Sequence, residues 1–148
     1  MDMKYMDLAF KEAEKAFKQG EVPIGTVIVK NGKILAKTHN IKEKTACAVN
    51  HAEILAILKA SKKIKNWRLE DCDIYVTLEP CPMCASAIKQ SRIKNVYSAL
   101  KNKDKNNEII IKKIFETDMV NPAVNFSNDL STEKSEALLQ KFFVSRRK

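Results

Sequence analysis

The N-terminal segment repeats apolar residues at the spacing of a helix. Four of them lie three or four positions apart among charged neighbours: Met6, Phe10, Ala13 and Phe17. This pattern is typical of an amphipathic helix with one buried side. Gly20 follows at the position where a helix commonly ends in a left-handed residue. The pattern therefore predicts an opening helix that packs on a core.

Two β-rich runs come next, over residues 24–29 and 33–37, and the pair Asn31-Gly32 separates them. Asn-Gly tolerates the positive φ angles of a tight two-residue hairpin turn. We therefore expect the first two strands to be antiparallel neighbours.

The middle of the chain alternates between helical and β-rich patterns. In order, they predict a helix over 50–60, a strand over 74–78, a helix over 81–90 and a strand over 93–100. Such alternation indicates a partly parallel sheet with helices packed against it. The expected fold class is α/β, a three-layer α/β/α sandwich, to which the opening hairpin adds an antiparallel part.

The last third of the chain is less regular. Residues 101–107 are polar and turn-like, 108–115 predict a short helix, and 121–128 show no clear pattern. Ser131 is a favourable N-cap for a final helix that runs to about Arg147.

Length and composition fit a single globular domain over residues 1–148. The chain is 45% hydrophobic and 30% charged. Its charged N-terminus has no apolar run that would act as a signal peptide or cross a membrane, so a cytoplasmic protein is expected. The formal net charge of +9 indicates either a polyanionic partner or simple solubility.

Four residues carry the chemistry that the sequence predicts: His51, Glu53, Cys81 and Cys84. A catalytic zinc site commonly uses three imidazole, thiolate or carboxylate ligands and leaves the fourth position to water. His51, Cys81 and Cys84 would supply those three ligands. Both segments are predicted at helix N-termini, where the helix dipole favours thiolate and hydroxide. Zinc lowers the pKa of bound water to about 7.

Glu53 is predicted to be the acid and base of this site. It would take a proton from water and pass it first to a ring nitrogen and then to the departing amine, so that ammonia is lost. The alternative is a solvated glutamate that only complements the helix dipole. The spacing of His-x-Glu and Pro-Cys-x-x-Cys matches zinc-dependent nucleobase deaminases.

Two further cysteines, Cys47 and Cys72, are expected to be small buried residues. Four cysteines in a chain of this kind favour a metal site or free thiols over disulfides. One alternative remains open. If Cys47, Cys72 or His39 completed the coordination shell, the zinc would be structural and the protein would be a non-catalytic module.

Other motifs extend over nearly the whole chain: Glu21-Val22-Pro23-Ile24-Gly25, Asn40, Tyr75 to Pro80, Ser91-Arg92-Ile93 and the tail from Leu138 to Arg147. Together with the metal-binding pattern, they resemble the bacterial tRNA-specific adenosine deaminases of the cytidine deaminase-like superfamily. The resemblance implies a central mixed five-stranded sheet with helices on both faces. It also implies conversion of adenosine to inosine at the wobble position of tRNA, position 34, with one Zn²⁺ per chain.

The resemblance further implies how substrate is held. Asn40 would hydrogen-bond the purine, Ala52 would contact it through its backbone, and Val22 with Pro23 would line the base pocket. The implied partners are the tRNA anticodon stem-loop, whose loop base can be splayed out and read by its edge, and a second copy of the chain in a homodimer.

Candidate RNA contacts lie in two places. The C-terminal helix offers Phe142, Phe143, Arg146, Arg147 and Lys148. Their cations suit phosphate contacts, whereas core packing is the alternative for the phenylalanines and a frayed basic end is the alternative for the last three residues. The second place is Asn102, a candidate RNA contact that stands where family members usually carry an aspartate.

The runner-up interpretation is a deaminase of free guanine or cytosine, with the same metal chemistry on a smaller substrate. Pro82 also occurs in small-base deaminases and does not favour tRNA. The C-terminal helix and the overall basicity favour RNA, because a free-base enzyme needs no basic rim. Riboflavin-pathway deaminases share the motif, but they commonly carry a reductase domain for which 148 residues leave no room.

Overall fold

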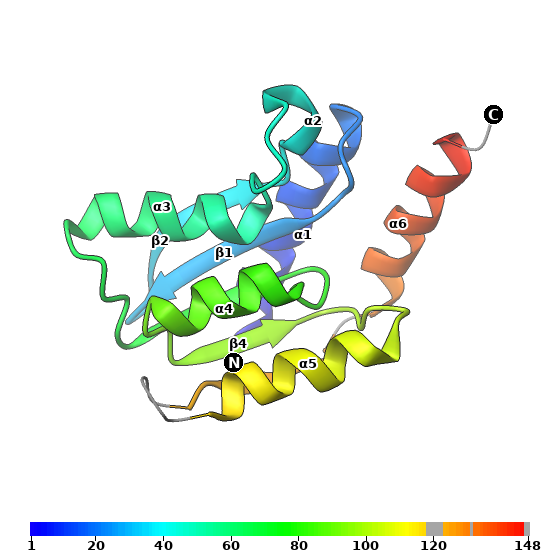
Figure 1. Ribbon diagram of the computed structural model, residues 1–148. Helices are drawn as coiled ribbons and strands as arrows, with labels where there is room; N and C mark the ends of the chain where they lie inside the picture. Colours follow the sequence, from blue (N-terminus) through cyan, green and yellow to red (C-terminus); the bar gives the residue numbers. More distant parts are fainter. Residues whose placement is uncertain (118–122, 131, 147–148) are drawn as a thin grey trace.

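The sheet at the centre of the molecule has five strands among the residues that the computed structural model describes, 1–117, 123–130 and 132–146 (Figure 1). They are β1 (Gly25–Lys30), β2 (Lys33–His39), β3 (Cys72–Val76), β4 (Asn95–Ser98) and β5 (Asn125–Ser127). Their spatial order is β2-β1-β3-β4-β5. β1 is antiparallel to both of its neighbours, and β3, β4 and β5 run parallel. The expected mixed five-stranded sheet is confirmed.

Helices cover both faces of this sheet. α1 (Met3–Lys18) lies on one face, and α3 (Ala52–Ile64), α4 (Pro82–Gln90) and α5 (Lys105–Glu116) lie side by side on the other (Figure 1). Neighbouring residues of a strand point to opposite faces. Val27 accordingly packs under α1, whereas Ile28 belongs to the larger core under the other three helices. The three-layer sandwich predicted from the alternating pattern is confirmed.

Two details fix the N-terminal half. Asn31 and Gly32 have φ angles of 49° and 77°, as the predicted tight turn between β1 and β2 requires. A Cβ atom on Gly25 would lie 1.8 Å from the carbonyl oxygen of Ala9. Only glycine at the start of β1 therefore lets α1 lie this close to the sheet.

Several element boundaries differ from the predictions. α3 runs four residues past the expected end at residue 60, and a short helix, α2 (Lys42–Thr45), was not expected. β5 occupies three residues of the stretch that showed no clear pattern. α6 (Thr132–Arg146) is the expected last helix, while its predicted cap Ser131 and the predicted end at Arg147 lie outside the described residues. None of the helices in the described part of the chain is long and apolar enough to cross a membrane.

Candidate functional site

The three predicted metal ligands lie together at the N-termini of α3 and α4. His51 is the residue that precedes α3, Cys81 precedes α4, and Cys84 follows in its first turn. The His51 Nδ1 atom is 3.7 Å from the Cys81 sulfur and 3.6 Å from the Cys84 sulfur. All three ligand atoms lie within 4.8 Å of one another. One nitrogen and two sulfurs at this spacing suit a metal ion that keeps one coordination position open.

The residues proposed as a fourth ligand lie elsewhere. Cys72 is buried at the start of β3, and His39 is hydrogen-bonded to Glu12. Within the described ranges, His51, Cys81 and Cys84 form the one group of three or more potential ligands, and Cys47 is not part of it. The geometry therefore fits an open three-ligand site better than a closed structural one.

The two thiols differ in acidity in the metal-free protein. A hydrogen bond from Cys84 lowers the pKa of Cys81 to about 5, against the opposing effect of burial. The same hydrogen bond and burial raise the pKa of Cys84 well above its usual range. Cys81 is therefore the first of the pair to become the thiolate that a metal needs.

Glu53 lies in the first turn of α3, and only 3% of its surface is exposed. Its Oε1 atom is buried and has no hydrogen-bond partner among the described residues. Such an unsatisfied oxygen is costly in a folded protein, and a catalytic role is one of the reasons for which a protein retains it. Burial raises the pKa of Glu53 to about 7. A carboxyl group with this pKa can accept and return a proton near neutral pH.

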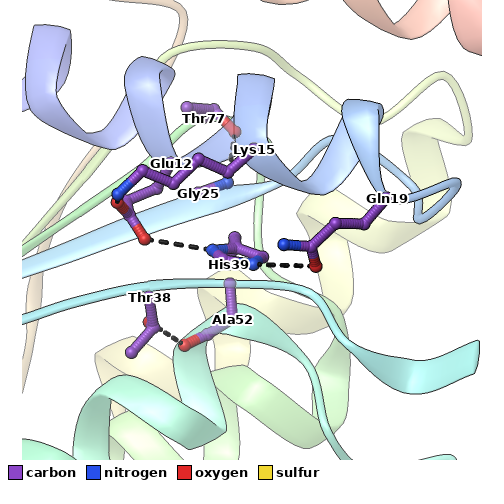
Figure 2. A network of polar contacts seen from close by, with 8 residues as sticks. All are labelled: Glu12, Lys15, Gln19, Gly25, Thr38, His39, Ala52 and Thr77. Carbon is purple, nitrogen blue, oxygen red and sulfur yellow. Dashed lines mark hydrogen bonds and ion pairs between the residues drawn. The ribbon is translucent and has the colours of Figure 1, made fainter. Parts of the chain in front are cut away.

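Polar side chains tie the end of β2 to the helices on both sides of it (Figure 2). The Thr38 hydroxyl donates a hydrogen bond of 2.7 Å to the carbonyl oxygen of Ala52, the first residue of α3. On α1, the Glu12 carboxylate lies 3.0 Å from His39 Nδ1 and 2.6 Å from Lys15 Nζ. Burial acts to raise the pKa of Glu12, but the hydrogen bonds from Lys15 and His39 outweigh it and lower the pKa. β2 is an edge strand here, so these contacts fix its end relative to α3.

Asn40 follows directly after β2 and is buried. Its Nδ2 atom lies 3.4 Å from the carbonyl oxygen of Val22, and its Oδ1 atom accepts a hydrogen bond of 3.2 Å from the N–H of Lys42. The residue after Asn40 donates its N–H to the carbonyl oxygen of Asn50, next to His51. Two predicted base-contacting residues, Asn40 and Val22, are thus brought together at the metal-binding end of α3.

A hollow of about 520 Å³ lies between α6 and the loop after β4. Its lining includes Val22, Leu78, Lys101, Asn102, Lys103 and Phe143. Three residues predicted to contact substrate or RNA, Val22, Asn102 and Phe143, therefore share one hollow. Its apolar and aromatic lining with lysines at one wall suits an unstacked base attached to phosphates.

The other predicted contacts are placed differently. Pro23 and Ala52 are buried, and Phe142 is buried with its ring 6.5 Å from that of Phe17, whereas Phe143 is 47% exposed. Arg146 is the last residue of α6. Arg147 and Lys148 lie outside the described residues.

Besides Glu12, two further buried glutamates, Glu21 and Glu79, were given no role by the sequence patterns. The Glu21 carboxylate accepts hydrogen bonds from the N–H groups of Glu43 and Lys44 and so holds α2. Glu79 accepts hydrogen bonds from segments far away in the chain, among them Asn107 and Asn128. Neither role follows from residue spacing, because every partner is brought there by the fold.

Known proteins resemble this chain over most of its length. The family of MafB19-like deaminases matches residues 1–147. A tRNA-specific adenosine deaminase of Aquifex aeolicus (strain VF5) is 38% identical over 143 residues, which cover 97% of this chain and 94% of that protein. One from Bacillus subtilis (strain 168) is 53% identical over 95 residues, which cover 64% of this chain and 59% of that protein.

Solved structures agree with this grouping. One, from a study of A-to-I editing by tRNA:A34 deaminases at the wobble position of transfer RNA, has a TM-score of 0.85 and 32% identity and covers 93% of this chain and 100% of its own. A guanine deaminase from Bacillus subtilis has a TM-score of 0.67 and 31% identity and covers 100% of this chain and 96% of its own. The chain belongs to the MafB19-like deaminases and, among them, to the tRNA-specific adenosine deaminases, which confirms the family, the fold and the enzyme class predicted from its sequence.

Proposed function

We propose that this protein converts adenosine to inosine at the wobble position of a tRNA anticodon, with one Zn²⁺ bound by His51, Cys81 and Cys84. The observation that carries this proposal is the group of three ligand atoms within 4.8 Å of one another, together with the buried Glu53 two residues after His51, whose Oε1 atom has no hydrogen-bond partner among the described residues. A nitrogen and two thiolates are a donor set that zinc accepts in hydrolytic sites. Bound zinc lowers the pKa of a water ligand to about 7.

The chain's own part in the reaction is proton transfer and positioning. Glu53 accepts a proton from the attacking water and delivers it to the ring nitrogen next to the reacting carbon. It then carries the second water proton to the amino group, which leaves as ammonia, so that adenosine and water give inosine and ammonia. Asn40 and the backbone of Ala52 hold the purine, and Val22 and Pro23 line its pocket.

The hollow beside α6 is the proposed place of the anticodon loop. Phe143 offers a partly exposed ring on which a neighbouring base stacks, and Lys101 and Lys103 offer charge to phosphates. Phe142 supports this wall, because its ring packs edge-on against that of Phe143 with the ring centroids 5.4 Å apart. In the sequence, Arg146, Arg147 and Lys148 follow and extend the cationic part of the same segment. The net charge of +9 favours the approach of RNA.

Deamination of a free base is the second candidate, because the similarity to a guanine deaminase covers all of this chain. The deciding experiment incubates the purified protein with an anticodon stem-loop, with free guanine and with free cytosine. We expect the stem-loop to be the one substrate of the three that reacts. Its product, inosine, is read as guanosine on sequencing. A stem-loop with guanosine at the wobble position is the matched control. Ammonia from a free base with an unchanged stem-loop would overturn the tRNA assignment.

We also propose that the protein is a homodimer in which each copy contributes to RNA binding. Large apolar side chains stand exposed on and before α3 and on α4, among them Val49, Leu58 and Met83. Exposed apolar groups on neighbouring elements favour burial against a partner. Light scattering of the purified protein tests this proposal, and a fully active monomer would contradict it.

The proposed location is the cytoplasm. None of the four cysteines is in a disulfide, and free thiols are kept reduced in that compartment. A protein tagged and imaged in its host, or fractionated from it, should be found with the tRNA pool.

A further inference from the structure

The carboxylate of Glu79 receives hydrogen bonds from three segments that are distant in the sequence. Glu79 is only 2% exposed. Its Oε1 atom accepts a hydrogen bond of 2.5 Å from the side-chain amide of Asn128, and its Oε2 atom accepts one of 2.8 Å from that of Asn107. The backbone N–H of Asn102 lies 3.4 Å from Oε2. A buried carboxylate is stable only when hydrogen-bond donors of the protein replace the water molecules that would otherwise solvate it. The segments that carry these donors are therefore held to Glu79.

Each of these segments reaches a different part of the site. Asn102 belongs to the loop that lines the hollow, and this loop is also held by a 2.7 Å hydrogen bond from the Glu79 N–H to the carbonyl oxygen of Leu100. Asn128 lies in the connection from β5 to α6, whose helix forms the other wall. The Asn107 amide also donates a hydrogen bond of 3.0 Å to the carbonyl oxygen of Pro80, which precedes the metal ligand Cys81.

We infer that Glu79 is a positioning residue, whose carboxylate holds both walls of the RNA-facing hollow in place relative to the metal-binding loop. Glu79 lies two residues before Cys81, so its contacts join the substrate side to the chemical side through a few covalent bonds. This inference rests on the proposed function, because the hollow is taken as the place of the anticodon loop. It assigns Glu79 a role in substrate affinity and not in proton transfer.

The test exchanges the two partners of one hydrogen bond. Asn128→Asp sets a carboxylate against the Glu79 carboxylate and so opens the wall on the α6 side. We expect KM for the stem-loop to rise about tenfold, the size of effect that the loss of one charge-assisted hydrogen bond allows. Metal content should be unchanged, and kcat should stay within about twofold. In the double variant Glu79→Gln with Asn128→Asp, an amide again faces a carboxylate, and KM should return toward the wild-type value.

Asn125→Asp is the matched control, because it adds the same charge three residues away, on an exposed side chain that contacts Asn95 and not Glu79. It should leave KM unchanged. If Asn128→Asp does not fold, Asn128→Ala takes its place in the KM measurement. An unchanged KM in a folded Asn128 variant, or a double variant no better than Asn128→Asp, would show the inference to be wrong.

A readout without substrate separates this inference from the proposed function. The backbone N–H of Asn102 bonds the Glu79 carboxylate, and that of Leu130 bonds the carbonyl oxygen of Ser98. Hydrogen exchange of both amides should become faster in Asn128→Asp and return toward the wild-type rate in the double variant. Inactivity of the wild-type protein on the stem-loop would refute the proposed function, while the exchange data would still decide whether Glu79 holds the two walls. Unaltered exchange in Asn128→Asp would refute the inference alone.

Discussion

The metal side and the substrate side of the site are built in different ways. The metal side uses two short segments, residues 51–53 and 81–84, each at the first turn of a helix that packs on the sheet. The hollow draws its lining from residue 22, residue 78, the loop 100–103 and residues 136–144. The groups that do chemistry are therefore held by core packing, whereas the loop after β4 and the connection to α6, which border the hollow, are held by hydrogen bonds to the Glu79 carboxylate.

This difference indicates which property each half controls. A rigid support suits atoms that must stay within a fraction of an ångström during proton transfer. A more exposed, multi-segment surface suits the selection of a large substrate. The comparison predicts that changes on the metal side abolish catalysis, and that changes around the hollow alter affinity.

Loss of a metal ligand should have the largest effect. In Cys84→Ser, a buried sulfur of the metal group is lost, and we expect little bound metal and activity at background level because the nucleophile is no longer generated. Metal content measured by mass spectrometry and inosine formation check this result. Cys47→Ser is the control, since Cys47 is outside the metal group, and it should keep both. Metal loss in the control would revive the structural-zinc interpretation.

Removal of the proton-transfer group should have the next largest effect. Glu53→Gln keeps the size of the side chain but cannot accept the proton, so kcat should fall by about 10³-fold, within the range of general acid-base catalysis. KM and metal content should change little. Glu70→Gln, at an exposed glutamate away from the site, serves as the control. Activity close to that of the wild type in Glu53→Gln would refute the assignment of Glu53.

The unusual pKa of Glu53 predicts a pH effect on stability in the metal-free protein. Burial raises this pKa from 4.5 to about 7, so the folded state holds the proton more tightly than the unfolded state. The contribution to stability is full below pH 4.5 and is lost as pH rises to 7, by about 3 kcal/mol in total. Denaturant unfolding of wild type and Glu53→Gln should show their difference in unfolding free energy changing over this range. A constant difference would contradict the raised pKa.

The same contrast explains how much the sequence could predict. The hairpin was predictable because Asn31-Gly32 encodes its own turn, and the metal ligands were predictable because Cys81 and Cys84, three positions apart, meet on one side of a helix. β5 has only three residues, too few for a pattern. α2 has four, and it is held by the distant carboxylate of Glu21.

The substrate side was least predictable for a physical reason. Glu79 meets partners 23, 28 and 49 positions away, and a residue's own sequence neighbourhood carries no information about contacts at such separations. Family motifs pointed to Val22, Asn102 and Phe143 one by one. Only the fold places these three residues around one hollow.

The smallest effect is expected for an aromatic ring at the rim of this hollow. In Phe143→Ala, the loss of one base-stacking surface should raise KM for the stem-loop about tenfold, because stacking on an aromatic side chain contributes about 1–3 kcal/mol per base. Since none of the three metal ligands lines this hollow, kcat and metal content should stay the same. Trp67→Ala is the control, because Trp67 is an equally exposed aromatic residue outside the lining of the hollow. If both substitutions weakened RNA binding equally, general charge and surface effects would explain the affinity, and the hollow would lose its special role. If only Phe143→Ala weakened RNA binding, substrate recognition would be assigned to the hollow, separate from the helix N-termini that carry the chemistry.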